Sequence, residues 1–198
     1  MLNVARLALA TTATVAMTYQ FAVLNVDPEY ARGNFFSFFT IQSNILAVCA
    51  LFLLVCVPRE RRSPLLDGFR SAAVLYIAIT GVVFALLLSG LQEDLQTATS
   101  WVDFVVHKLM PVLVVLDWVV DPPRHRLPWW TVLAWLAYPA GWLAYTLVRG
   151  EIVEWYPYPF VDVSELGYAG VLGRSAVLTL GFALGAAALL WLGNRRAR

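Results

Sequence analysis

Charged side chains are scarce in this chain of 198 residues. Asp, Glu, Lys and Arg together account for 14% of it, and the formal net charge is +1. A soluble domain carries about a quarter charged residues, and a nucleic-acid-binding protein needs a basic surface. We therefore expect no nucleic-acid partner. Apolar residues make up 60% of the chain and the mean hydropathy is +0.69, which indicates an integral membrane protein.

Cysteine is almost absent. The chain has Cys49 and Cys56, and seven helical residues separate two such positions by roughly 10 Å, which is too far for a disulfide. Two thiols alone do not make a metal site. We interpret both as small apolar residues, and we expect neither a metal nor a cofactor.

The sequence also lacks internal repeats, low-complexity segments and a soluble domain. A membrane-spanning helix needs about 20 mostly apolar residues. Six such stretches predict a single all-α domain of residues 1–198 with six transmembrane helices, near 4–25, 36–57, 70–91, 102–120, 129–148 and 168–192. A cleaved signal peptide is the alternative for the first stretch, but its length and its polar residues favour a span.

Arginine placement predicts the orientation of the spans. If the six spans alternate, ten arginines fall on one side, and the opposite loops hold two arginines and eight acidic residues. Cytoplasmic loops are rich in arginine, so both termini are predicted to be cytoplasmic. The ten are Arg6, Arg59, Arg61, Arg62, Arg70, Arg124, Arg126, Arg195, Arg196 and Arg198; the opposite loops hold Arg32, Arg149, Asp27, Glu29, Glu93, Asp94, Glu151, Glu154, Asp162 and Glu165.

The outward loop WYPYPFVDVSELGY, residues 155–168, has two interpretations. Its prolines prevent regular helix, and its aromatic residues suit the membrane–water interface. Asp162, followed three residues later by Glu165, resembles a capping box that opens the last span. The loop is then either an interfacial turn with a helix cap, or also a lid over a site.

Three polar residues fall at one depth. Spans two, four and six run in the same direction, and Thr40, His107 and Arg174 each lie five or six residues inside their outer ends. At about 1.5 Å per residue, this is roughly 7–9 Å below the outer boundary. Ionisable groups at such depth usually face a bundle interior or a wet cavity. The layer is therefore the candidate functional site.

Local spacing supports this layer. Thr40 and Asn44 share a helix face, with Ser43 beside them. Asp103 precedes His107 by four residues and can orient its imidazole, as a carboxylate does in a hydrolytic triad. Pro111 follows His107 by four residues and cannot donate to its carbonyl, so the helix is expected to kink there.

Each of these residues also has a structural interpretation. Threonine, serine and asparagine in membrane helices often join helices by hydrogen bonds, so Thr40 alone does not indicate catalysis. Arg174 either pairs with Asp103 or Glu165, or holds a ligand carboxylate. Asp117, at the far end of the fourth span, is interpreted as an interfacial anchor.

A hydroxyl near an imidazole is the minimum for nucleophilic acyl transfer. His107 takes the proton of Thr40 and returns it to the leaving group. Ser43, Asn44, Gln42 or backbone N–H groups are candidate donors to the oxyanion. A site at this depth meets lipid-like esters that arrive sideways from the bilayer.

The run FFTIQSN at 38–44, HKLMP at 107–111 and YPYPF at 156–160, on a chain with six predicted spans, resembles the androgen-induced protein family. The resemblance covers essentially the whole chain, and the short loops are similar to those of a bacterial branch. It implies a multipass threonine hydrolase of fatty acid esters of hydroxy fatty acids in the bacterial cytoplasmic membrane. By position, it implies Thr40 as the nucleophile and His107 as the histidine; it implies no role for Asp103 or Arg174.

The sequence thus predicts a membrane-embedded hydrolase of lipid esters that needs no metal or cofactor. Two other classes of protein remain open. The polar layer can be the binding site of a transporter or lipid-binding protein, although no inverted repeat or pair of broken helices is evident. It can also serve helix packing alone, in a structural or assembly protein.

Overall fold

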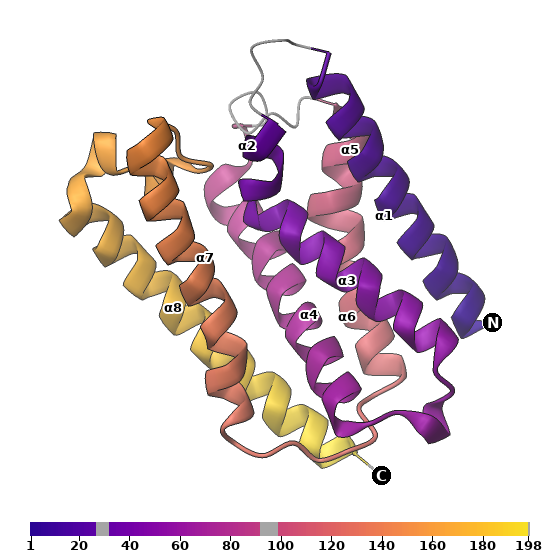
Figure 1. Ribbon diagram of the computed structural model, residues 1–198. Coiled ribbons are helices and arrows are strands. Elements are labelled where there is room, and N and C mark those ends of the chain that lie inside the picture. Colours follow the sequence, from indigo (N-terminus) through magenta and orange to yellow (C-terminus); the bar gives the residue numbers. More distant parts are fainter. Residues whose placement is uncertain (27–31, 92–98, 198) are drawn as a thin grey trace.

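The computed structural model describes residues 1–26, 32–91 and 99–197. These residues form an all-helical bundle without strands (Figure 1). The elements are α1 (Leu2–Leu24), α2 (Arg32–Ser37), α3 (Phe39–Cys56), η1 (Arg59–Arg61), α4 (Pro64–Val83), η2 (Phe84–Leu88), α5 (Ser100–Phe104), η3 (Val105–Leu109), α6 (Met110–Val120), α7 (Thr131–Val153), η4 (Pro159–Val161) and α8 (Val163–Arg196). Of the η elements, η1 and η4 are 3-10 turns, and η2 and η3 are π-helical turns.

Within the described residues, five helices are long and apolar enough to cross a membrane, namely α1, α3, α4 with η2, α7 and α8. They match five of the six predicted stretches. The remaining stretch, 102–120, lies in a continuous run of helical residues that consists of α5, η3 and α6 in succession. The π turn η3 divides this run, so no single regular helix covers it.

Three local irregularities shape these helices. Phe38 is extended (φ −68°, ψ 127°) and separates α2 from α3, a break that the apolar pattern did not predict. Pro111 lies in the first turn of α6. The kink expected from this proline takes the form of the π turn η3, which directly precedes α6. Gly167 adopts a positive φ of 63° inside α8, so the regular part of this helix starts near the predicted residue 168.

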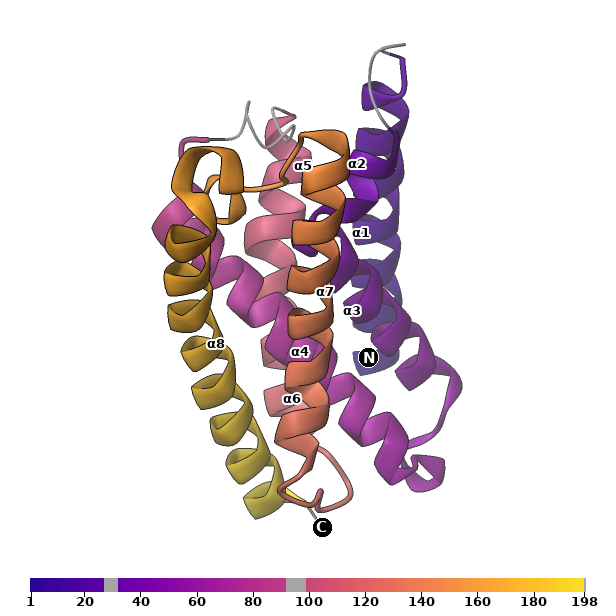
Figure 2. The same ribbon diagram turned by 60° about the vertical axis from the view of Figure 1, so that its left-hand side comes forward.

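The bundle consists of two groups of helices. α1 packs on α3, α3 on α4, and α4 on α6, while α7 and α8 pair with each other and α8 also packs on α4. In both views α7 and α8 run side by side along the bundle (Figure 1, Figure 2). α1 begins and α8 ends toward the same end of the bundle, where the α3–α4 and α6–α7 connections also lie.

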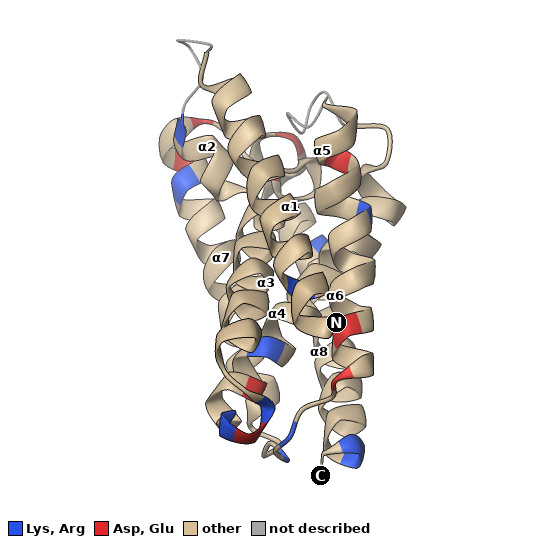
Figure 3. Ribbon diagram, turned by 90° about the vertical axis from the view of Figure 1, so that its right-hand side faces the viewer, with Lys and Arg blue, Asp and Glu red and all other residues tan. Residues whose placement is uncertain are grey.

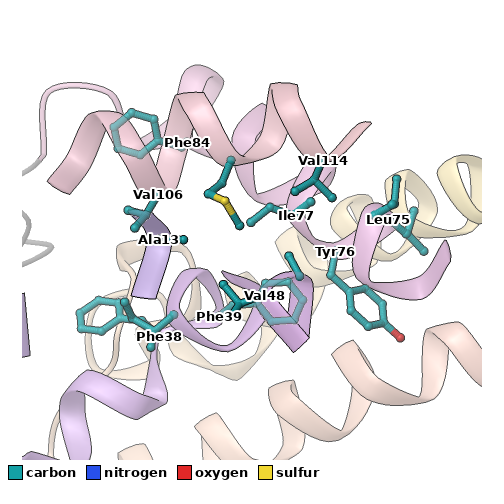
Figure 4. Packing of buried hydrophobic residues seen from close by; sticks show 14 of the residues in the cluster. Ala13, Phe38, Phe39, Val48, Leu75, Tyr76, Ile77, Phe84, Val106 and Val114 are labelled. Carbon is teal, nitrogen blue, oxygen red and sulfur yellow. The ribbon is translucent and has the colours of Figure 1, made fainter. Parts of the chain in front are cut away.

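Small residues let α1 approach α3 closely. Ala10, Ala13 and Ala16 are fully buried and lie on one face of α1, the arrangement that brings membrane helices into contact. Figure 4 shows labelled core side chains, among them Ile77 and Val106, converging between the helices. The outer faces of α1, α7 and α8 instead expose large apolar residues, and charged residues gather toward the two ends of the bundle (Figure 3). This distribution is that of a membrane protein.

A buried ionic cluster joins α1, α4 and the end of α6. The Arg6 guanidinium donates to Asp117 at 2.6 Å and to Asp121 at 2.5 Å, and Arg70 donates to Asp117 at 2.7 Å. Arg59 and Arg62 also pair with Asp121. Asp117 is therefore part of a network between helices rather than an isolated anchor.

Four of the arginines used to predict the orientation belong to this ionic cluster: Arg6, Arg59, Arg62 and Arg70. The acidic residues Asp27, Glu29, Glu93 and Asp94 and the arginine Arg198 lie outside the described residues.

Gly81 tests the packing of α4 against α6. A Cβ at Gly81 lies 2.7 Å and 2.9 Å from the ring carbons of Pro111, so Gly81→Ala is expected to destabilise the fold by about 1–3 kcal/mol. A Cβ at Gly141 on α7 meets nothing within 4 Å, so Gly141→Ala is expected to be neutral or stabilising by about 0.4–1 kcal/mol. Thermal unfolding in detergent measures both. Equal melting temperatures for the two variants would contradict the contact.

The ionic cluster predicts a dependence of stability on pH. Burial alone would raise the pKa of the Asp121 carboxyl, but hydrogen bonds from Arg6 and Arg62 and the charge of Arg70 outweigh it and lower the pKa from 3.8 to about 2. Because the folded-state pKa lies below the unfolded one, this stabilisation is complete above about pH 4 and is lost as the pH falls toward 2. We expect the melting temperature to fall less steeply over this range in Asp121→Asn than in wild type.

The exposed Glu60 is the control for this measurement. Glu60→Gln is expected to leave the acid dependence as in wild type. An acid dependence of Asp121→Asn equal to that of wild type would exclude this role of Asp121.

Candidate active site

The break at Phe38 places Thr40 at the N-terminus of a long helix. Thr40 is the second residue of α3, so its backbone N–H has no partner within the helix. The Thr40 N–H instead donates to the Tyr158 hydroxyl at 3.1 Å. The helix dipole adds partial positive charge here, which suits a position where negative charge develops on a reacting oxygen.

His107 lies on the π turn η3, opposite Thr40. Its Nδ1 lies 2.9 Å from the Asp103 Oδ1, and its Nε2 lies 3.3 Å from the Thr40 Oγ1. The three residues are each at most 5% exposed. The structure therefore brings together the predicted hydroxyl, imidazole and carboxylate, and the distance to the hydroxyl is at the long end that ligand-free sites show.

The hydroxyl of Tyr158 completes this group. It lies 3.2 Å from the Thr40 Oγ1 and, as described above, accepts from the Thr40 N–H. With an ionised Asp103 and a neutral His107, Nδ1–H donates to the carboxylate and Nε2 accepts the Thr40 proton. Tyr158 must then donate its own hydrogen to the Thr40 Oγ1. Burial raises the pKa of Tyr158 to about 12, so the hydroxyl keeps this hydrogen at neutral pH.

A stacked ring and a buried amide hold the imidazole and its turn in place. Phe84, the first residue of η2, stacks on His107 with ring centroids 3.9 Å apart and planes 8° apart. Asn44 donates from one Nδ2 to the Thr40 carbonyl at 2.8 Å and to the Val106 carbonyl at 3.2 Å. α3 and the π turn are thus joined directly beside Thr40 and His107.

The three predicted oxyanion donors on α3 have other partners. Ser43 donates to the Thr40 carbonyl and contacts the Thr80 hydroxyl, and Asn44 is used as described above. The amide of Gln42 donates to the Phe36 carbonyl and accepts from Tyr138. These three side chains therefore stabilise α3 and its contacts with neighbouring segments. They follow Thr40 by two to four residues, and so they lie farther along the helix than its free N-terminal N–H groups. The donors near the Thr40 oxygen are its own N–H and Tyr158.

Arg174 does not join the site. It is exposed on α8 and pairs with neither Asp103 nor Glu165; Asp103 is occupied by His107. The neighbouring residue Ser175 is the one that faces inward, because successive helix positions point about 100° apart. The depth of Arg174 along its span did not predict the direction in which its side chain points.

The α7–α8 loop contains the predicted cap of the last span, and its Tyr158 packs against Thr40. Asp162 is the N-cap of α8 and accepts from the N–H groups of Ser164 and Glu165. Tyr158 stacks on Phe160 at 5.1 Å and meets the edge of Phe38 at 5.6 Å. The sequence did not predict Tyr158 as part of the candidate site; the signal for it is the aromatic, proline-rich YPYPF run.

Glycine at position 150 lets this loop fold back on α7. A Cβ at Gly150 would lie 2.0 Å from the ring of Tyr156. The Tyr156 ring therefore lies directly on the backbone of α7 at Gly150. Tyr156 precedes Tyr158 by two residues. This close approach is one of the contacts that hold the loop against α7.

A cavity of about 200 Å³ opens beside Thr40. Its walls come from α3, α4, α7, α8 and the loop with Tyr158, and the described residues that line it carry no charge. Ala140 on α7 and Thr179 on α8 line the cavity and are also exposed. The cavity therefore reaches the surface between these two helices, on an apolar face.

A second, smaller cavity of about 20 Å³ lies on the other side of Thr40, toward α1. Its polar lining residues are Gln20, Thr40, His107 and Tyr158. Thr40 and Tyr158 line both cavities, whereas His107 lines the small one.

Among the described residues, no three His, Cys, Asp or Glu side chains are placed to hold a metal ion. Comparisons with protein-family models, with curated proteins and with solved structures found no match for this chain. The resemblance to the androgen-induced protein family therefore stays a prediction, and function must be argued from the site itself.

Proposed function

We propose that this chain is a membrane-embedded hydrolase of lipid esters, with Thr40 as the nucleophile and His107 as the general base and acid. The series from the Asp103 carboxylate through His107 to the Thr40 hydroxyl, at 2.9 Å and 3.3 Å, carries the proposal. Burying this series in an apolar bundle is costly unless its members are paired. Helix packing alone does not need a carboxylate, an imidazole and a hydroxyl in this order.

Acylation uses the groups as they lie. His107 Nε2 takes the proton of Thr40 as Oγ1 attacks the ester carbonyl carbon. The oxyanion that forms accepts from the Tyr158 hydroxyl and the Thr40 N–H. When the intermediate collapses, the bond to the alkoxy oxygen breaks, and His107 returns the proton to the leaving alcohol. The acyl group stays on Thr40, and Asp103 stabilises the imidazolium in between.

The large cavity supports a lipid as the substrate. Its uncharged, mainly apolar lining suits a neutral acyl chain, and its opening between α7 and α8 faces the side on which lipid is expected. Fatty acid esters of hydroxy fatty acids fit this class, and they are the substrates that the family resemblance implies.

We also propose six spans with both termini in the cytoplasm. The helical run of α5, η3 and α6 is 21 residues from Ser100 to Val120, long enough to cross at about 1.5 Å per residue. The arginine-rich connections and both termini lie toward one end of the bundle. Thr40 then lies in the outer half of the membrane.

Variants of the three central residues test the proposal. Thr40→Ala, His107→Gln and Asp103→Asn are each expected to lower the turnover of a short chromogenic ester and of a branched fatty ester by about 10²-fold or more. Thr40→Ser retains a hydroxyl and is expected to retain measurable turnover. Purified protein in detergent is assayed, and size exclusion establishes that each variant is folded.

Matched controls come from residues outside the site. Thr14 bonds within α1, and His125 pairs with Asp67 in the α6–α7 connection. Thr14→Val and His125→Gln are expected to retain wild-type turnover. A folded Thr40→Ala with full turnover would refute the proposal. A wild type that binds lipid esters in the cavity without hydrolysing them would instead favour a lipid-binding protein or transporter, for which the same cavity is the site.

Tyr158→Phe tests the oxyanion donor separately. It removes one hydroxyl and keeps the ring that packs against Phe38 and Phe160. Loss of one such donor typically lowers kcat by about 10²- to 10³-fold, and we expect this size of effect on kcat with little change in KM. An unchanged kcat would show that Tyr158 acts as a lid without stabilising the oxyanion.

A further inference from the structure

Thr40 lies between two cavities of different size and polarity. The large one is mainly apolar and holds the acyl chain in the proposed function. The small one has a volume of about 20 Å³. His107 lines this small cavity but does not line the large one. Hydrolysis needs a water molecule that contacts both His107 and the acyl carbon, and the large cavity is then filled by the chain. Water must therefore come from the side of the small cavity.

The small cavity has the size and lining that a single water needs. A water molecule requires at least roughly 10–15 Å³ and two to four polar partners. Four polar side chains among the described residues line the cavity: Gln20, Thr40, His107 and Tyr158. Gln20 lies on α1 and is 3% exposed, so its buried side chain lines the same cavity as Thr40 and His107.

We propose that the small cavity is the site of the hydrolytic water and that Gln20 is the residue that positions it for attack on the acylated Thr40; this inference rests on the proposed function. His107 Nε2 takes one proton from the water as its oxygen attacks the acyl carbon. The bond from that carbon to Thr40 Oγ1 then breaks, and Oγ1 takes the proton from His107. A carboxylic acid and the free threonine result. Substrate and water thus reach Thr40 from opposite sides.

The experiment separates acylation from deacylation. Wild type and Gln20→Met, which keeps the length of the side chain but removes its hydrogen bonds, are mixed with a chromogenic fatty ester. Alcohol release and the intact mass of the protein are followed in time. For Gln20→Met we expect an unchanged acylation rate, an acyl-enzyme that accumulates, and deacylation slowed by roughly 10- to 100-fold. In steady state kcat and KM then fall together, and kcat/KM stays at the wild-type value.

Three further variants guard against a purely structural effect. Met17, one turn before Gln20 on α1, is also buried, and Met17→Leu is expected to deacylate like wild type. Gln20→Glu keeps a carbonyl oxygen at the same place and is expected to restore faster deacylation than Gln20→Met. Leu24 lines the small cavity without being fully buried; Leu24→Trp fills it and is expected to slow deacylation even if Gln20→Met does not fold.

The outcomes distinguish the two proposals. If wild type acylates Thr40 and both Gln20→Met and Leu24→Trp deacylate at its rate, the water site is wrong and the hydrolase stands. If Gln20→Met loses acylation and deacylation equally, Gln20 has a structural role and the inference is overturned. If wild type never carries an acyl group on Thr40, the proposed function fails, and the water site fails with it.

Discussion

The contact between the Tyr158 hydroxyl and the N-terminus of α3 at Thr40 is the interaction on which the site depends. It is one of the contacts that join the α7–α8 pair to α3, and both residues line the large cavity. The contact exists because Phe38 interrupts the helix and leaves the Thr40 N–H without an intrahelical partner. Without that break the same N–H would be used within the helix.

The polar side chains around Thr40 are tolerated in an apolar bundle because they bind one another. The carboxylate, imidazole and two hydroxyls satisfy one another, and Asn44 binds the carbonyls next to them. The π turns at Phe84 and His107 stack the two rings and alter the regular backbone pattern locally. Such turns cost stability, and they persist where surrounding packing holds them. This arrangement concentrates the irregular backbone of the bundle at the proposed reaction centre.

The two cavities on either side of Thr40 differ in size and in the residues that line them. Acyl chains suit the uncharged space between α4, α7 and α8, which opens toward the apolar surface. The space toward α1 is polar and small. In the proposed reaction, the lipid and the water molecule therefore approach Thr40 from different cavities.

The sequence by itself determined the all-helical class, the apolar stretches, the pairing of Asp103 with His107 and the cap at Asp162, because these depend on composition and on spacing within one helix. Depth along the spans also predicted that Thr40 and His107 lie in one layer. Tertiary structure alone decided the side chains that face the site. It turned Arg174 outward, gave Ser43, Asn44 and Gln42 other partners, and brought in Tyr158 and Gln20. Helix rotation and loop placement arise from packing between segments far apart in the chain, which no local spacing records.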